Sequence, residues 1–277
     1  MSPSAGPYES VDGLLVALDG AVLRLTLDRP AKRNAVDDTM MTALIDTIDA
    51  AGRDEAVRAI VLDGAGDHFC AGADIVARNA KGADGSERRP RVGSIQRRVP
   101  SQAHRLIPLL VSVQTPVVCA VTGWAAGIGF QIALAADVTI AADDATFWEP
   151  FTERGFTPDS GATWLLPRLV GAVRARELLL LNRRLTGTEA AAWGLVHAST
   201  PVDEVAAKVD EVVTQLATGP TVALGLTKWL LNTSPDRSLD DQLRQEAFAL
   251  ELSSRSEDFR EGLAAFKDKR PPRFEGR

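Results

Sequence analysis

Cysteine and histidine are scarce in this 277-residue chain, which contains two cysteines and three histidines. Cys70 and Cys119 each lie in an apolar strand context, and their separation fits neither a metal-binding motif nor a disulfide framework. We therefore expect both to be small buried hydrophobic side chains. The histidines at positions 68, 104 and 197 have no nucleophile or ligand spacing around them, so the sequence predicts no metal site.

Long apolar runs and an excess of positive charge are also missing. No uninterrupted apolar stretch approaches the ~20 residues that span a bilayer, and the first residues contain no basic segment followed by an apolar run. The formal net charge of -6 produces a field that does not favour nucleic acid or anionic membranes. We expect a cytoplasmic globular protein, ample in length to bury a core, with neither a membrane nor a nucleic acid as a partner.

Apolar periodicity predicts strands in the first half of the chain and helices in the last third. Strands are expected at residues 14–18, 22–27, 59–62, 115–121 and 138–142. Asp38 or Thr39 can cap a helix after the second strand, and Gly52 closes that helix. From Val202 the periodicity is helical almost to Lys269.

The pattern breaks between Ala77 and Arg98, where glycines and prolines alternate with basic residues. This composition predicts a mobile loop without helix or strand. Its arginines can attract the phosphates of a ligand, but charge runs on loops are usually solvated surface, and both interpretations stay open.

Two turns of small residues follow two of the apolar strands. Residues 69–75, FCAGADI, come after the strand at 59–62, and Gly123, Gly127 and Gly129 lead from the next strand into an apolar helix at about 128–136. Such turns let a ligand approach the main chain, and the first N–H groups of a helix have no internal partner. Two N–H groups converging on one oxygen would stabilise negative charge there, each donor contributing roughly 3 to 4 kcal/mol. Ordinary tight turns are the alternative interpretation.

Four segments, taken in order, resemble the crotonase family of enoyl-CoA hydratases and isomerases. They are residues 27–35 (LDRPAKRNA), 69–75, 115–137 and 258–272. The resemblance covers nearly the whole chain and implies an α/β fold. It implies a crotonase-like spiral of β-β-α repeats over residues 1–200, which carries the active site, and a C-terminal helical trimerisation region over residues 201–277. It further implies a homotrimer or a dimer of trimers.

The same resemblance implies an acyl-CoA substrate, with coenzyme A entering as part of the substrate and no permanently bound cofactor. The backbone N–H groups of Ala73 and Ile128 would form an oxyanion hole for the thioester. The implied CoA contacts are Arg29 and Lys32 for the phosphates, Ala71, Asp74 and Ile75 near the adenine together with Ala73, and Phe266 and Lys267 on the helix that closes the pocket. Gly127, Trp148 and Phe151 are expected to line the substrate pocket.

The chain departs from the hydratases of this family at two positions. Hydratases carry glutamates there to activate water, whereas this chain aligns Gln131 and Phe151 with them. General acid-base groups contribute about 10²- to 10⁴-fold each, and neither an amide nor a phenyl ring can accept a proton in their place. Gln131 can still orient a substrate, and Phe151 makes the pocket drier, so we expect chemistry without water.

One carboxylate remains in the motif. Asp159 matches the proton-transferring aspartate of crotonase-family isomerases, and residues 158–167 (PDSGATWLLP) resemble epoxyphenylacetyl-CoA isomerases. The resemblance therefore implies an isomerase-type proton shift by Asp159, with a helix-capping role as the alternative. Glu149 and Glu153 lie within two residues of Phe151 and are further candidates, although a surface position is the common case for glutamate.

Other functions stay open at this point. A true enoyl-CoA hydratase would use water held by Gln131, Asp159 or a nearby glutamate. A crotonase-type thioesterase or C–C hydrolase is a second alternative. A non-catalytic acyl-CoA-binding protein, which kept the fold and lost the glutamates, belongs to a different class.

Overall fold

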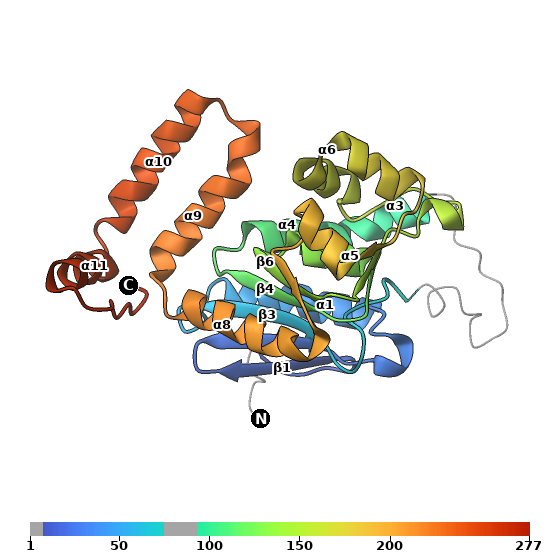
Figure 1. Ribbon diagram of the computed structural model, residues 1–277, viewed down its shortest axis with the longest axis horizontal. Coiled ribbons are helices and arrows are strands. Elements are labelled where there is room, and N and C mark those ends of the chain that lie inside the picture. The colour runs from blue at the N-terminus through green and yellow to red at the C-terminus, as the bar shows by residue number, and fades with distance from the viewer. Residues whose placement is uncertain (1–7, 75–92) are drawn as a thin grey trace.

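The computed structural model describes residues 8–74 and 93–277, which form two β-sheets and a set of surrounding helices (Figure 1). The larger sheet has six strands in the order β1-β2-β3-β4-β6-β9, and the smaller has three in the order β5-β7-β8. The strands are β1 Leu14–Asp19, β2 Val22–Leu27, β3 Ala59–Gly64, β4 Val117–Val121, β5 Trp124–Ala126, β6 Val138–Ala142, β7 Thr146–Trp148, β8 Leu185–Thr186 and β9 Ala198–Thr200.

The helices lie between these strands and after the last of them. They are α1 Asp38–Ala51, α3 Ser94–Arg98, α4 Ala103–Ser112, α5 Ile128–Ala135, α6 Ala162–Leu180, α7 Gly187–Trp193, α8 Val205–Ala217, α9 Thr221–Thr233, α10 Leu239–Ser253 and α11 Glu257–Asp268. Short 3₁₀ segments are η1 Pro30–Lys32, η2 Val99–Ser101, η3 Thr152–Arg154, η4 Val202–Glu204 and η5 Ser234–Asp236.

The larger sheet is parallel except for its first hairpin. β1 pairs antiparallel with β2 across the Asp19-Gly20 turn, and β2, β3, β4, β6 and β9 then run parallel. Because parallel strands end at one edge, the segments that follow β3 and β4 start from neighbouring positions. The five expected strands are present at these places, and the sheet brings the two predicted turns together.

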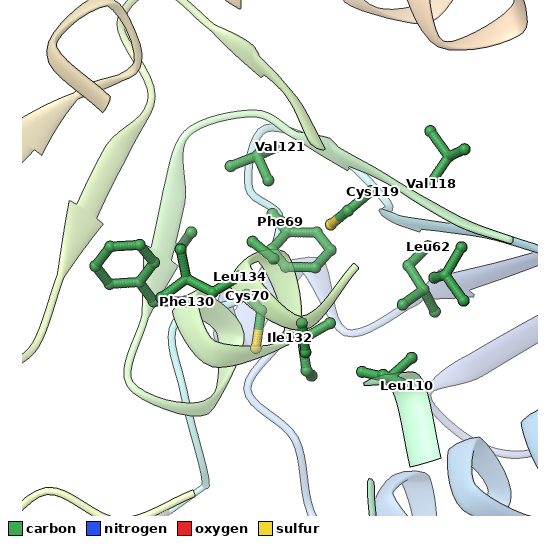
Figure 2. Packing of buried hydrophobic residues seen from close by; sticks show 14 of the residues in the cluster. Leu62, Phe69, Cys70, Leu110, Val118, Cys119, Val121, Phe130, Ile132 and Leu134 are labelled. Carbon is green, nitrogen blue, oxygen red and sulfur yellow. The ribbon is translucent and has the colours of Figure 1, made fainter. Parts of the chain in front are cut away.

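Helices cover both faces of this sheet, which explains its continuous apolar runs. α8 packs on β3, β4 and β6, while α4 packs on α1 and α5 on the opposite side (Figure 1). Figure 2 shows Phe69 and Cys70 among buried side chains from β3, β4, α4 and α5. The labelled neighbours are Leu62, Leu110, Val118, Cys119, Val121, Phe130, Ile132 and Leu134. Both cysteines are buried, as expected, and burial raises the pKa of the Cys70 thiol to about 12.

The capping residue of α1 differs from the expectation. Asp37 is the N-cap, and its carboxylate accepts a hydrogen bond from the Met40 amide at 3.0 Å. The proposed caps, Asp38 and Thr39, are already helical residues. Asp37 and Asp38 have identical side-chain chemistry, so the sequence did not distinguish them, whereas the extended backbone of Asp37 suits a cap. Gly52 closes the helix as predicted.

The predicted loop over residues 77–98 falls mostly outside the described residues. Its described end is helical, since α3 occupies Ser94–Arg98, and the expectation of irregular structure is wrong there. Gly93, with φ of 85°, is the last glycine of the breaker run, and its carbonyl accepts from the Arg97 amide at 3.2 Å. The residues between Gly93 and Pro100 include no glycine or proline, so a short helix can form there.

The last third of the chain is helical, as the periodicity predicted. α9 and α10 extend away from the sheets, and α11 lies at the far end of the molecule (Figure 1). Large apolar side chains are exposed along these helices, namely Leu231, Leu239, Leu243, Phe248, Leu250, Leu252, Phe259, Leu263 and Phe266. None of the helices in residues 8–74 and 93–277 has both the length and the apolarity needed to cross a bilayer.

One ion pair ties the C-terminal helices to the sheet. The Lys228 ammonium on α9 lies 2.7 Å from Asp137 Oδ2, and the Lys228 side chain is only 6 % exposed. The same carboxylate oxygen accepts from the Val117 amide at 2.7 Å, at the start of β4. The pair thus joins α9, the link between α5 and β6, and the edge of β4.

We predict that Lys228→Met lowers the free energy of unfolding by about 1–3 kcal/mol, because Asp137 loses its charged partner in a partly buried place. Urea denaturation measures this loss. The matched control is Lys208→Met, which breaks an exposed ion pair with Glu211 on α8 and should change stability by less than about 1 kcal/mol. Equal losses in the two variants would contradict the assigned role of the Lys228 pair.

Candidate active site

Backbone hydrogen bonds hold the first turn between β5 and the segment before α1. Cys70 donates to the Trp124 carbonyl at 2.8 Å and accepts from the Ala126 amide at 2.9 Å. On the other side, the Gly72 carbonyl accepts from Val36 at 2.8 Å. β5, which leads into the second turn, is therefore also hydrogen-bonded to the first turn.

Close approach at Gly129 and backbone conformation at Gly72 and Gly127 explain the glycines of the two turns. A Cβ on Gly129 would lie 2.5 Å from the Cys70 carbonyl oxygen, and a Cβ on Gly127 would lie 4.0 Å from the Gly72 Cα. Gly72 and Gly127 also have φ of 106° and 52°, a conformation that favours glycine. The two turns are therefore in contact, as the sequence interpretation required.

Two amides at this contact lack acceptors within the protein. Over residues 8–74 and 93–277, the N–H groups of Ala73 and Ile128 donate to no protein oxygen. Ile128 is the first residue of α5, where the free N–H groups of a helix are found. The Gly127 amide is used structurally, since it donates to the Trp148 carbonyl at 3.0 Å. Both amides are therefore available to donate to a ligand.

Basic and acidic residues form an ion-pair cluster beside the first turn. Asp74 Oδ2 lies 2.9 Å from the Arg29 guanidinium and 3.0 Å from the Lys32 ammonium. Arg29 also donates to the Ala35 carbonyl at 2.8 Å and is mostly buried, whereas the Lys32 side chain is 53 % exposed. The structure brings these three candidates together with Ala71, whose amide donates to the Arg33 carbonyl at 2.9 Å.

The remaining candidates for CoA contacts lie elsewhere. Ile75 is outside the described residues. Phe266 and Lys267 are on α11, with Phe266 85 % exposed, and α11 lies at the opposite end of the molecule from α5 (Figure 1). The fold of one chain therefore does not bring these two residues to the turns.

Gln131 is fully buried on α5 and has an unexpected partner. Its Nε2 donates to Glu149 Oε1 at 2.6 Å, and Glu149 is only 1 % exposed. The expectation of a surface position was wrong for Glu149, whereas Glu153 is exposed in η3. β5 and β7 are parallel, with Ala126 opposite Trp148, so the residue after each strand is enclosed at the same edge. That pairing of two three-residue strands, rather than any local pattern, buries Glu149.

The surroundings of Glu149 favour its neutral form. Burial raises the pKa of its carboxyl well above the ordinary value, the Gln131 hydrogen bond offsets part of that rise, and the nearby charge of Asp159 adds to it. Within the described residues, Glu149 Oε2 and Gln131 Oε1 have no hydrogen-bond partner. The site therefore contains a buried carboxyl group with one oxygen that has no hydrogen-bond partner among the described residues.

Asp159 is exposed, and it does not cap a helix. Gly161 is the N-cap of α6, and no side chain accepts a hydrogen bond there. The Asp159 carboxylate instead accepts from the Ser160 hydroxyl at 2.7 Å. Because the structure removes the capping alternative, the carboxylate has no evident structural task in the described part of the chain.

Aromatic side chains form the apolar part of the site. Phe151 is buried, packs edge-on against Phe156 with ring centroids 5.5 Å apart, and lies 3.9 Å from the position of a Cβ on Gly127. The Trp148 ring instead stacks with the Arg184 guanidinium, 4.3 Å from the ring centroid. Phe151 is thus the aromatic residue placed against the second turn. The described residues contain no group of three or more metal-ligating side chains.

Comparisons with known proteins cover nearly the whole chain. A sequence model of the family described as Enoyl-CoA hydratase/isomerase matches residues 18–277. The 1,2-epoxyphenylacetyl-CoA isomerase of Escherichia coli K12 is 38% identical over 265 residues, which cover 95% of this chain and 98% of that protein. The 2,3-dehydroadipyl-CoA hydratase of the same strain is 32% identical over 266 residues, covering 95% and 99%. The structure of an enoyl-CoA hydratase from Bacillus anthracis has a TM-score of 0.87 at 29% identity, covering 96% and 100%. The similarity therefore includes both sheets and the C-terminal helices.

We predict that Gly129→Ala destabilises the protein by about 1–3 kcal/mol, because the new methyl group meets the Cys70 backbone and separates the two turns. Thermal and urea denaturation measure the change. The control is Gly262→Ala on α11, where the added Cβ lies 3.6 Å from the Phe274 ring and helix propensity favours alanine by up to about 1 kcal/mol. A Gly129→Ala protein as stable as the Gly262→Ala protein would rule out the tight contact.

The raised pKa of Glu149 makes stability depend on pH. Between the ordinary pKa and the raised folded pKa, the folded protein binds one proton more than the unfolded chain. Stability therefore falls as pH rises through this window, by up to about 1.4 kcal/mol per pH unit. Glu149→Gln has no such group, so we predict that wild type loses stability relative to this variant as pH rises from the ordinary pKa of a glutamate toward the raised pKa of Glu149. Parallel stability profiles of the two proteins would show that Glu149 is not held neutral.

Proposed function

The chain belongs to the enoyl-CoA hydratase/isomerase family, the crotonases, and from that premise we propose that it isomerises an acyl-CoA thioester by moving a proton between carbons. One observation carries the choice of isomerisation. The two positions that hold water-activating glutamates in hydratases are occupied by Gln131 and Phe151, and both side chains are buried at the second turn. Neither can accept a proton, so the usual water-activating pair is absent from these two positions.

The thioester oxygen binds between the two turns in this proposal. The amides of Ala73 and Ile128 donate to it, and their donation strengthens as negative charge develops during proton removal. The contact between the Gly72 and Gly127 turns, together with the lack of protein acceptors for both amides in the described segments, supports this role. Phe151 excludes water from the same region and lowers the local dielectric, which increases the effect of the two donors.

Asp159 takes a proton from the acyl chain. A carbon next to a thioester carbonyl loses a proton when a base accepts it and the electron pair moves onto the thioester oxygen. Among the described residues, the Asp159 carboxylate accepts a hydrogen bond only from the Ser160 hydroxyl, and it caps no helix. One of its oxygens is therefore left for this task. The name of the 38%-identical relative, 1,2-epoxyphenylacetyl-CoA isomerase, supports an isomerase assignment.

Hydration is the second candidate, and one observation favours it. Glu149 places a buried carboxyl beside Gln131, where a hydratase carries a glutamate, and a relative at 32% identity is named 2,3-dehydroadipyl-CoA hydratase. Burial raises the pKa of the Glu149 carboxyl, which argues against this candidate, because a carboxyl that holds its proton does not deprotonate water.

The coenzyme A moiety extends from the first turn toward the ion-pair cluster. Lys32, half exposed beside Asp74, is placed to meet the phosphates, and Arg29 supports it from the buried side. In this proposal Ala71 and Asp74 contact the adenine. A pocket-closing role for Phe266 and Lys267 requires α11 of a second subunit, which agrees with a homotrimer or a dimer of trimers assembled through residues 201–277.

The test follows two reactions with one purified protein. Conversion of 3-hexenoyl-CoA to 2-hexenoyl-CoA is read from the absorbance of the conjugated thioester, and hydration of crotonyl-CoA from the loss of that absorbance. We expect the first reaction and not the second. Rapid hydration without isomerisation would replace the proposal by the hydratase alternative, and tight binding of both esters without turnover would favour a binding protein.

We predict that Asp159→Asn lowers kcat for 3-hexenoyl-CoA by about 10²- to 10⁴-fold, because the amide cannot accept the proton. Folding and the Kd of hexanoyl-CoA should be unchanged, as measured by thermal melting and calorimetry. The control is Asp203→Asn, an exposed aspartate in η4, which should keep the wild-type rate. Wild-type activity in Asp159→Asn would refute the assigned role.

A further inference from the structure

Glu149 follows β7 directly, at the level where the second turn follows β5. The two strands run parallel with Ala126 opposite Trp148, and the Gly127 amide donates to the Trp148 carbonyl at 3.0 Å. Residues that follow paired parallel strands lie side by side at one edge of the sheet. The Glu149 backbone is therefore next to the turn that begins α5 with Ile128.

The Glu149 side chain is buried, and only one of its two carboxyl oxygens has a hydrogen-bond partner among the described residues. Gln131 Nε2 donates to Oε1 at 2.6 Å, and Oε2 has no partner among residues 8–74 and 93–277. The same segments supply no lysine or arginine as a counter-ion, since Arg154 and Arg184 lie over the Trp148 ring instead. A carboxylate here would be buried without compensation, whereas a carboxylic acid has an O–H that can donate from Oε2.

Asp159 provides a second carboxyl in contrasting surroundings. It is exposed and hydrogen-bonded by the Ser160 hydroxyl, and its charge acts on Glu149. Paired titratable groups whose surroundings differ in this way divide into an acid and a base. The enclosed Glu149 suits the acid, and the solvated Asp159 suits the base.

We propose that Glu149 is a second catalytic residue, a carboxylic acid held by Gln131 that delivers a proton to the acyl chain while Asp159 removes one. This inference rests on the proposed isomerase function. It assigns proton removal and proton delivery to two different carboxyl groups instead of to Asp159 alone. Gln131 is then a positioning residue, because its amide fixes Oε1 and leaves Oε2 as the donating oxygen.

The proton and electron balance can be followed for a 3-enoyl thioester. Asp159 takes a proton from C2, the C–H bond breaks, and the electron pair moves onto the thioester oxygen between Ala73 and Ile128. The O–H bond of Glu149 then breaks and its proton bonds to C4, while the electron pair returns and the double bond moves to C2–C3. Asp159 ends protonated and Glu149 ionised. A proton transfer from Asp159 to Glu149, directly or through water, restores both groups.

The first test needs no variant. The probe is 3-hexenoyl-CoA with deuterium at both C2 positions, in ordinary water and with enzyme in excess, so that each site turns over once. The hydrogen delivered to C4 then comes from Glu149, which has equilibrated with solvent, and we expect no deuterium at C4 by mass spectrometry or NMR. Deuterium transferred from C2 to C4 would show that Asp159 alone carries the proton, which overturns the inference.

The second test uses two glutamates four residues apart. Glu149→Gln keeps the size of the side chain but has no acidic proton, so we expect kcat for 3-hexenoyl-CoA to fall by about 10²- to 10⁴-fold. The Kd of hexanoyl-CoA should stay the same, which separates a lost proton donor from a deformed pocket. Glu153→Gln is the matched control, because Glu153 is exposed in η3, and it should keep both values. A wild-type kcat in Glu149→Gln would overturn the inference.

Failure of this inference is distinct from failure of the proposed function. If Glu149→Gln is active and Asp159→Asn is inactive, isomerisation by Asp159 stands and the role of Glu149 is wrong. If the wild type does not convert 3-hexenoyl-CoA, the proposed function itself fails, and the inference fails with it.

Discussion

Contact between two backbone turns is the constraint on which the rest of the structure depends. Cys70 forms hydrogen bonds with the first and last residues of β5, and a side chain at position 129 would have no space against Cys70. The parallel order of β3 and β4 in the larger sheet delivers one turn and the start of the other to the same edge. The buried side chains in Figure 2 include Phe69 and Cys70 of the first turn, so the positions of the Ala73 and Ile128 amides depend on how β3, β4, α4 and α5 pack.

The electrostatic character of the site follows from what surrounds those turns. Phe151 and the buried residues of α5 remove water, and removal of water strengthens main-chain donors while it disfavours a free carboxylate. The same property therefore favours charge on a ligand oxygen between two amides and disfavours charge on Glu149. Asp159 is exposed to solvent, so burial does not disfavour its charged form as it does that of Glu149.

The fold was largely predictable because its signals are local. Apolar runs marked the strands, and the glycines marked the two turns. Prediction failed where one residue type occurs at adjacent positions, as for Asp37 and Asp38, or where burial comes from distant pairing, as for Glu149. β7 has only three residues, which are too few to show an alternation of buried and exposed positions. The burial of Glu149 could therefore not be predicted from such a pattern. The capping alternative for Asp159 also needed the backbone, since left-handed residues at 160 and 161 move the cap to Gly161.

The enclosure of Cys70 has a consequence for the redox behaviour of the protein. Its sulfur accepts a hydrogen bond from the Gly72 amide at 3.4 Å, and burial raises the pKa of the thiol to about 12. The reactive thiolate is therefore nearly absent at neutral pH, and peroxide or alkylating agents have no access to it in the folded chain. A cysteine at the centre of the site thus serves as a small apolar filler, and oxidative stress leaves the turn intact for as long as the protein stays folded.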